Sequence, residues 1–189
     1  MSEDHETLIR LIHQRLRYAR QFDRLFQDCK GCWVRARPAE NRDFRRILDM
    51  YDSFEPKASA QGLPPADPER RQYWVHQIIS DSISVLAEVE KRVVAHACLI
   101  DMDRKAWGEM EIAVHQDWQN RGIGTELTCL LVDIARTFEY RRIWLTVDNL
   151  NRRAVHVYEK CGFSFIGPFE TEREMEICFD GFKNQQVCD

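Results

Sequence analysis

Apolar residues recur every three or four positions in several stretches of the chain, and this spacing places them on one face of an α-helix. The strongest pattern covers 122–140, where a leucine-rich stripe runs along the segment. Similar spacing predicts amphipathic helices over 5–28, 69–80 and 151–161. A further helix is expected to begin at Pro38, because the fixed backbone angle of proline suits the first turn of a helix.

Other stretches alternate apolar and polar residues, which is the two-residue period of a half-buried strand. Three of them follow one another closely and predict an antiparallel meander over 84–90, 92–101 and 107–115. Further strands are expected at 33–37, 141–147, 163–169 and 174–179. The proline-rich stretch 54–68 has no period and indicates a loop. This order of elements predicts an α/β (α+β) fold in which a mixed sheet carries helices on its faces.

The length of 189 residues and an apolar content of 44% are typical of one domain with a sizeable core. We expect a helical extension over 1–30 and a single domain over 31–189. The apolar face of the extension would pack on the domain or on a second copy of the chain, so a homodimer stays open.

The formal net charge is −4, with acids and bases interspersed, and this argues against a general nucleic-acid-binding surface. The first residues are polar and acidic, unlike a secretory signal, and no apolar run approaches the roughly 20 residues that span a bilayer. The expectation is a cytoplasmic protein that binds neither nucleic acid nor membranes.

Seven cysteines are present, an odd number that favours reduced thiols over a disulfide framework. Cys29 and Cys32 form a C-x-x-C pair, a spacing found in zinc and redox sites. A zinc site needs a second pair at similar spacing, and Cys178 and Cys188 do not provide one. We therefore interpret the pair as incidental thiols and expect no metal ion.

The segment QNRGIGTEL, residues 119–127, places two glycines just before the long apolar helix. It is not a Walker loop, because no Gly-Lys-Ser or Gly-Lys-Thr occurs, and Leu127 stands where a dinucleotide fingerprint needs its third glycine. Glycines still let a ligand approach the backbone, and the free amides at a helix start attract anions. Taken alone, the segment is either a phosphate cradle or an ordinary helix start.

A later segment, NLNRRAVHVYEKCGF at 149–163, narrows this choice. Together the two segments resemble the GNAT superfamily of acetyl-CoA-dependent N-acetyltransferases, the first matching its pyrophosphate motif and the second its last helix and following strand. The strand ending IAVH before the glycines also matches, and the resemblance covers about 84–169. It implies a mostly antiparallel sheet with a central splay, and transfer of an acetyl group from acetyl-CoA to a primary amine in a ternary complex.

The resemblance also implies a three-part cofactor site. Loop amides would bind the pyrophosphate, and the end of the third meander strand would pair with the pantetheine arm, provided that the strand at 143–147 splays away. Asn151 would hydrogen-bond the arm, although asparagine is also a common helix cap. The expected cofactor-binding residues are Ile112, Ala113, Val114, Gln119, Asn120, Arg121, Gly122, Ile123, Gly124, Thr125 and Asn151.

Acetyl transfer needs a neutral amine and a proton for the departing thiolate. Tyr158 stands where the family tyrosine lies and is expected to be the general acid, unless it only packs in the core. Glu109 and Glu111 share one strand face and are the candidate bases. The positions where the family often has its base match Gly108 and Met110, and a strand bulge would switch the parity and bring one of the glutamates inward. A water chain is the alternative, and a solvated strand face is the simpler interpretation.

The resemblance further implies an acceptor pocket that involves 54–65, Tyr73, Trp74 and 167–174. The missing family base and the unmatched N-terminal helix leave open a non-catalytic acyl-CoA-binding regulatory module. A third possibility is an interaction domain in which the glycine turn binds nothing.

Overall fold

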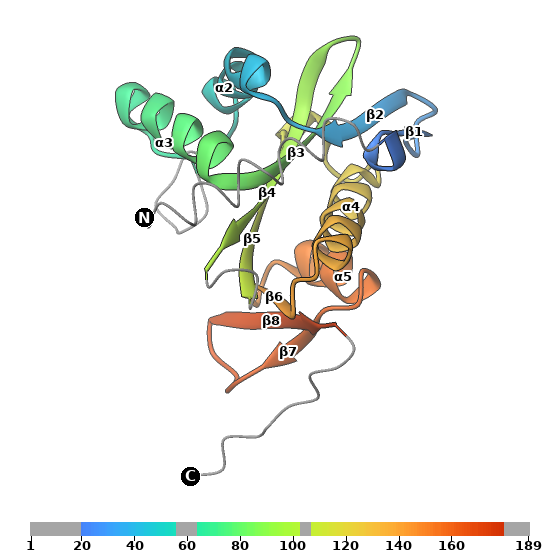
Figure 1. Cartoon of the computed structure of the whole chain (residues 1–189), viewed down its shortest axis with the longest axis vertical. Coiled ribbons are helices and arrows are strands. Elements are labelled where there is room, and N and C mark those ends of the chain that lie inside the picture. Colours follow the sequence, from blue (N-terminus) through green and yellow to red (C-terminus); the bar gives the residue numbers. More distant parts are fainter. Residues whose placement is uncertain (1–19, 56–63, 103–106, 180–189) are drawn as a thin grey trace.

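The computed structural model describes residues 20–55, 64–102 and 107–179, which form one eight-stranded sheet covered by helices (Figure 1). The strands are β1 (Arg24–Gln27), β2 (Trp33–Pro38), β3 (Ser82–Val89), β4 (Arg92–Asp101), β5 (Trp107–Val114), β6 (Arg142–Asp148), β7 (Ser164–Ile166) and β8 (Glu172–Cys178). The helices are α2 (Phe44–Asp52), α3 (Pro68–Asp81), α4 (Ile123–Thr137) and α5 (Arg152–Lys160), with short 3-10 turns η1 (Arg20–Phe22), η2 (Asn41–Asp43) and η3 (Gln116–Trp118).

The sheet has the strand order β1-β2-β3-β4-β5-β6-β8-β7, and β5–β6 is its parallel pair. The expected antiparallel meander is therefore confirmed, as is the mixed, mostly antiparallel sheet. α2 and α3 lie on one face of the central strands, and α4 lies with α5 on the other (Figure 1). Each face of the sheet therefore has its own hydrophobic core, because successive strand residues point to opposite faces. In β3, Val85 packs in the core that contains α4, and Leu86 packs in the core that contains α2 and α3.

The predicted helix over 5–28 is wrong at its C-terminal end, where β1 forms and pairs with β2 in a hairpin. Phe22 and Phe26 are four residues apart and suit a helical face, yet both pack on the core beside α4, with the ring of Phe22 6.5 Å from that of Phe138. Pairing with the free edge of β2 therefore determined the structure of 24–27, although the apolar spacing there also suits a helix. Residues 5–19 lie outside the described part of the chain.

The helix expected to begin at Pro38 begins later. Pro38 ends β2, and the N–H of Ala39 continues the strand pairing by donating to the carbonyl of Ser84 at 2.8 Å. The helical turn starts after Glu40, which forms a capping box with Asp43. Strand pairing therefore uses the residue that the sequence pattern assigned to a helix start.

The sheet opens between β5 and β6. Their pairing is confined to Trp107–Glu109 against Arg142–Trp144, after which β6 continues along β8 only. From Met110 onward, no strand in the described ranges pairs with β5 on this side. The splay that the resemblance implies is thus present, and the far end of β5 has an open backbone edge.

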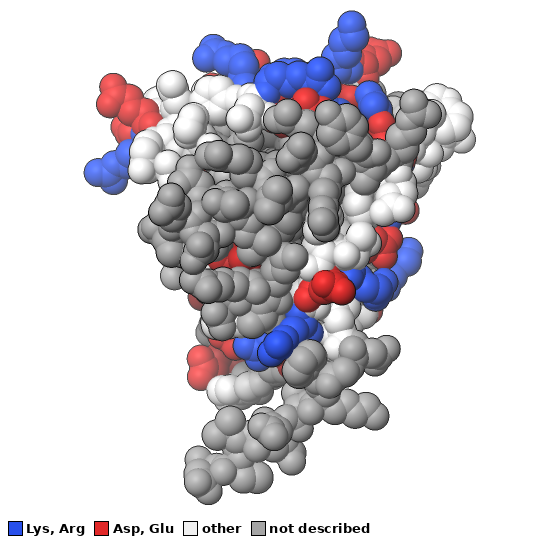
Figure 2. Space-filling view, in the orientation of Figure 1, with Lys and Arg blue, Asp and Glu red and all other residues white. Residues whose placement is uncertain are grey.

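The described surface carries charges of both signs. Figure 2 shows Lys and Arg side chains lying beside Asp and Glu side chains along this face, so the basic residues drawn there do not gather into one patch. Across the described ranges, no helix combines the length and the apolar character that crossing a bilayer requires.

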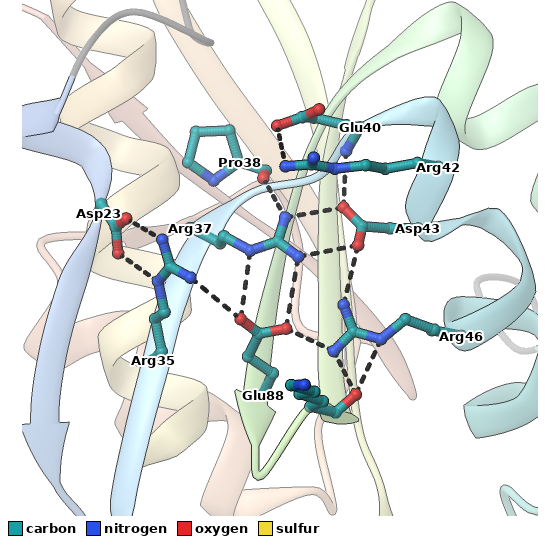
Figure 3. A network of polar contacts seen from close by, with 10 residues as sticks. Asp23, Arg35, Arg37, Pro38, Glu40, Arg42, Asp43, Arg46 and Glu88 are labelled. Atoms are coloured by element: carbon teal, nitrogen blue, oxygen red, sulfur yellow. Dashed lines mark hydrogen bonds and ion pairs between the residues drawn. The ribbon is translucent and has the colours of Figure 1, made fainter.

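An ion-pair network joins β2, β3 and α2 at the outer end of the sheet (Figure 3). Arg37 donates to both carboxylate oxygens of Asp43, at 2.7 and 2.8 Å, and to Glu88 at 3.3 Å. Arg46 pairs with the same two acids, at 3.0 Å from Asp43 and 2.5 Å from Glu88. Only 2% of the Asp43 side chain is exposed, so this pair ties the start of α2 to the sheet.

We predict that Asp43→Asn lowers the free energy of unfolding by about 3 kcal/mol at neutral pH, because it leaves two arginines, one of them largely buried, to share the single acid Glu88. Burial alone would raise the pKa of Asp43, but hydrogen bonds and charges of the arginines hold it below its usual value, and Glu88 behaves likewise. Stability from these groups is complete above pH 4–5, roughly their unfolded pKa values, and is lost as the pH falls through the folded values. Urea unfolding between pH 3 and 7 should show this loss.

The matched control is Asp49→Asn, on the same helix, whose side chain is 60% exposed and pairs with exposed Arg45. Its effect should stay below about 0.5 kcal/mol. Equal losses in the two variants would contradict a stabilising role for the network.

Candidate active site

The loop between β5 and α4 presents unpaired amides at the start of α4. Gly122 is the N-cap, with a left-handed φ of 85°, and no side chain caps the helix there. Asn120 is also left-handed, with φ 59°. The first amides of a helix have no partner within it, so they remain available to an anion. The side chain of Ile123 is fully buried, so this residue offers only its backbone.

The turn of the β1–β2 hairpin braces this loop. The N–H and the thiol of Cys29 donate to two successive loop carbonyls, those of Arg121 and Asn120, each at 3.3 Å. A trans peptide directs its N–H opposite to its carbonyl, so the amides of Arg121 and Gly122 point away from the hairpin. Cys29 thus has a structural contact that its C-x-x-C spacing did not reveal.

Arg121 itself is part of the brace. Its guanidinium lies 3.4 Å from a carboxylate oxygen of Asp28, donates to the carbonyl of Asp117 at 3.0 Å and stacks 4.3 Å from the Trp118 ring. The Asp28 carboxylate is fully buried and also accepts from the backbone of Cys32 at 2.9 Å. The side chain expected to add positive charge for a phosphate therefore supports the loop from behind.

The backbone groups at the end of β5 point alternately toward β4 and toward the open edge. The N–H of His115 donates to Val94 on β4 at 3.0 Å, and strand residues two apart point the same way. Ala113 therefore directs its backbone toward β4, while Ile112 and Val114 direct theirs toward the splay. The carbonyl of Val114 already accepts from the side chain of Gln119 at 3.1 Å.

Tyr158 and Asn151 lie on the far side of the splay, on α5. The side chain of Asn151 caps the helix by accepting from the N–H of Ala154 at 3.2 Å, as the simpler interpretation expected. Tyr158 is buried, packs on Phe163 at 5.9 Å, and has no hydrogen bond from its hydroxyl to any described residue. Burial raises the pKa of Tyr158 to about 12. The phenol thus keeps its proton throughout the physiological range.

Glu109 and Glu111 face α2 and α3 without any bulge. β5 keeps an unbroken register with β4, and Ala113, which has the same parity as the glutamates, packs in the α2–α3 core. The bulge considered from the sequence is absent, and none is required, because helices cover both faces of the sheet and side chains on either face of β5 point toward a helix. Burial, and then the charge of Glu109, raise the pKa of Glu111 to about 7.

A buried polar cluster beside Glu111 was not anticipated from the sequence. The Tyr51 hydroxyl lies 2.9 Å from Nδ1 of His96, and Glu111 is close enough to contribute to the raised pKa of Tyr51 after burial does. Burial lowers the pKa of His96 to about 4, so its ring is neutral at physiological pH. The sequence signal for this cluster was a histidine, His96, inside an apolar strand. Its partner Tyr51 lies on α2, and only the packing of α2 on the sheet brings the two together.

The aromatic residues expected around an acceptor divide into two kinds. Trp74 packs edge-on against Tyr51 at 5.0 Å, on the same face as Glu111. Tyr73 is 68% exposed and contributes little to that face. The loop residues 56–63 lie outside the described part. Over the described ranges, no group of three or more His, Cys, Asp or Glu residues could hold a metal ion.

This arrangement of splayed strands and an uncapped helix start agrees with a match to the acetyltransferase (GNAT) family model over residues 45–163, more than half of the chain. The chain belongs to the GNAT family. Among curated relatives, it is 33% identical over 60 residues to spermidine N(1)-acetyltransferase of Escherichia coli (strain K12) and 35% identical over 66 residues to streptothricin acetyltransferase of Streptomyces lavendulae. These matches cover 31% and 33% of this chain, and 32% and 35% of the relatives, so they span about a third of the relatives' length.

Solved GNAT structures agree over most of the fold. The GNAT domain of S. lividans PAT matches with a TM-score of 0.69 and 18% identity, over 84% of this chain and 98% of that one. The structure of yncA from Salmonella typhimurium with its cofactor acetyl-CoA matches with a TM-score of 0.65 and 18% identity, over 82% and 99%. At these identities the likeness shows the fold.

Proposed function

We propose that this protein transfers the acetyl group of acetyl-CoA to a primary amine by direct attack in a ternary complex. One observation carries the proposal: the open backbone edge of β5 leads directly to the uncapped amides of α4. Such an edge can pair with the two amides of a pantetheine arm, while the helix start binds a pyrophosphate. The residues present therefore suit coenzyme A along its length.

The cofactor-binding groups are proposed as follows. The backbones of Ile112 and Val114 pair with the arm, and the loop residues 120–125 offer their amides to the phosphates. Gln119 and Arg121 hold the loop in shape through Val114 and Asp28. Asn151 caps α5 through its side-chain oxygen, which leaves its amide nitrogen for the arm. Acetyl-CoA supplies an acetyl thioester, whose carbonyl an amine can attack.

Glu111 is the proposed general base. It lies on the face opposite α4, and a pKa of about 7 leaves much of the carboxylate ionised at neutral pH. A base with such a pKa can take the proton of an ammonium group near neutrality. Glu109 is the neighbouring alternative, since burial also raises its pKa. Tyr158, across the splay, is the proposed acid for the departing thiolate.

An amine is supported as the acceptor class by the carboxylates beside this face. Two relatives carry amine acceptors in their names, spermidine and streptothricin. The test is calorimetric titration with acetyl-CoA, followed by thiol detection with a panel of primary amines. Binding without thiol release would favour the alternative of a non-catalytic acyl-CoA-binding module, and absence of binding by folded protein would overturn both.

Glu111→Gln should lower kcat/KM about 100-fold at pH 8, because the amine then loses its proton acceptor. For the parent, kcat/KM should rise with pH up to about 7, since the carboxyl group must be deprotonated to act as a base. The variant should lack this ascending limb. pH–rate profiles from pH 5.5 to 9 measure both effects.

Glu109→Gln is the matched comparison on the same strand face. It should keep most of the activity and an ascending limb shifted to lower pH, because the negative charge that raises the pKa of Glu111 is gone. The reverse result, with the limb lost in Glu109→Gln alone, would assign the base to Glu109.

A further inference from the structure

Two cysteine thiols meet between α4 and α5, outside the residues proposed for the reaction. Cys129 lies on α4, Cys161 directly follows α5, and their Sγ atoms are 2.7 Å apart. Both side chains are only partly buried, so small solutes can reach them. We propose that Cys129 and Cys161 form a redox-modification site, which a hydroperoxide converts into a disulfide linking α4 to α5.

The geometry needs little rearrangement. α4 and α5 pack side by side on one face of the sheet (Figure 1), and the two sulfurs already lie within hydrogen-bonding distance. Bond formation requires an approach of less than about 1 Å. Two other described cysteines differ: Cys98 is 1% exposed, and the Cys29 thiol donates to a loop carbonyl.

The two thiols have different roles in the step. The hydrogen bond from Cys161, helped by the charge of Arg24, lowers the pKa of Cys129 to about 7 against the opposing effects of burial, Glu126 and Asp133. The same hydrogen bond, with burial, raises the pKa of Cys161 despite Lys160 nearby. Cys129 is therefore the nucleophile at neutral pH, and Cys161 holds the shared proton.

The chemistry balances with one hydroperoxide. The Cys129 thiolate attacks a peroxide oxygen, the O–O bond breaks, and a sulfenic acid forms with release of hydroxide, or of an alkoxide from an alkyl hydroperoxide, which takes a proton from solvent to become water or an alcohol. Cys161 sulfur then attacks the Cys129 sulfur, its proton leaves with the sulfenic hydroxyl as water, and the disulfide forms. Two thiols are oxidised and one peroxide bond is reduced.

The site lies within the proposed cofactor region. The Cys161 thiol also approaches the carbonyl of Thr125, in the first turn of α4, at 3.6 Å. Tyr158 lies on α5, three residues before Cys161. A disulfide would therefore join the helix that presents the loop amides to the helix that carries the proposed acid.

The test uses the full reduced chain treated with a small excess of hydrogen peroxide and mapped by mass spectrometry under non-reducing conditions. We expect a peptide linking Cys129 to Cys161, and a melting temperature raised by about 10 °C that dithiothreitol returns to the starting value. Cys129→Ser and Cys161→Ser should show neither change, whereas the matched control Cys178→Ser should show both.

Treated, folded parent protein in which these two cysteines remain unlinked would overturn the proposal, whether they stay reduced or oxidise singly. Linkage of Cys29 to Cys32 instead would do the same if Cys129 and Cys161 stay separate. The readout needs no acetyl transfer, so failure of the proposed function would not affect it.

Discussion

Tyr158→Phe should lower kcat about 100-fold while leaving the Kd for acetyl-CoA within about twofold, because the substitution removes the proposed acid and no cofactor contact. The thiolate would then leave without a proton from the protein. The ring of Phe would keep the packing against Phe163, so folding should be preserved. Thiol release under saturating amine, combined with calorimetric titration, separates the two quantities.

The pH dependence provides a second check. Because burial raises the pKa of Tyr158 to about 12, the phenol should cause no fall in kcat between pH 7 and 10. Tyr140→Phe is the matched control: Tyr140 is also buried and its hydroxyl has no partner in the described structure, but it precedes β6 at the end where β5 and β6 stay paired. Equal activity of parent and Tyr158→Phe would remove the acid role.

Gly124→Glu should weaken acetyl-CoA binding at least about 100-fold, because it places a carboxylate among the amides proposed to bind phosphate. A Cβ at this position would meet only a methyl carbon of Val114, at an ordinary 3.5 Å. An acidic residue in the first turn also suits the helix dipole. The variant should therefore fold at least as well as the parent, and loss of binding would report on the site itself.

Gly124→Ala is the control with the same backbone change and no charge. It should bind acetyl-CoA within a few-fold of the parent, since a methyl group has room there. If both variants bind equally well, the α4 amides do not hold the pyrophosphate. If both fail to bind, the steric change matters and the electrostatic explanation is wrong.

Local patterns determined much of this fold because they depend on nearest neighbours along the chain. The stripe over 122–140 and the alternation over 92–101 appear as α4 and β4 within a few residues. The pattern failed at 24–27, where the phenylalanine spacing indicated a helix and the chain forms β1 instead. A four-residue segment satisfies both periods, and its choice depends on whether a partner strand is available.

The glycine turn at 119–127 also gave the proposed cofactor end of the site from sequence, since a loop and the helix that follows it are contiguous. The open edge of β5 was expected only on the condition that β6 splays away, and the register of the two strands had to decide this. The orientation of Glu111 was misjudged for a related reason. The sequence shows which residues share one face of a strand, but whether that face is covered depends on the helices that pack on each side of the sheet.

The sequence by itself thus indicated the family, most of the element order, the glycine turn before α4 and the candidate acid. Only the tertiary structure decided that Cys29 braces a loop 91 residues away and that Cys129 meets Cys161 across 32 residues. It likewise decided that Tyr51 lies against His96 and that Arg121 supports the loop from behind. Such contacts join segments distant along the chain, and their geometry is set by how helices and strands pack, which no local period encodes.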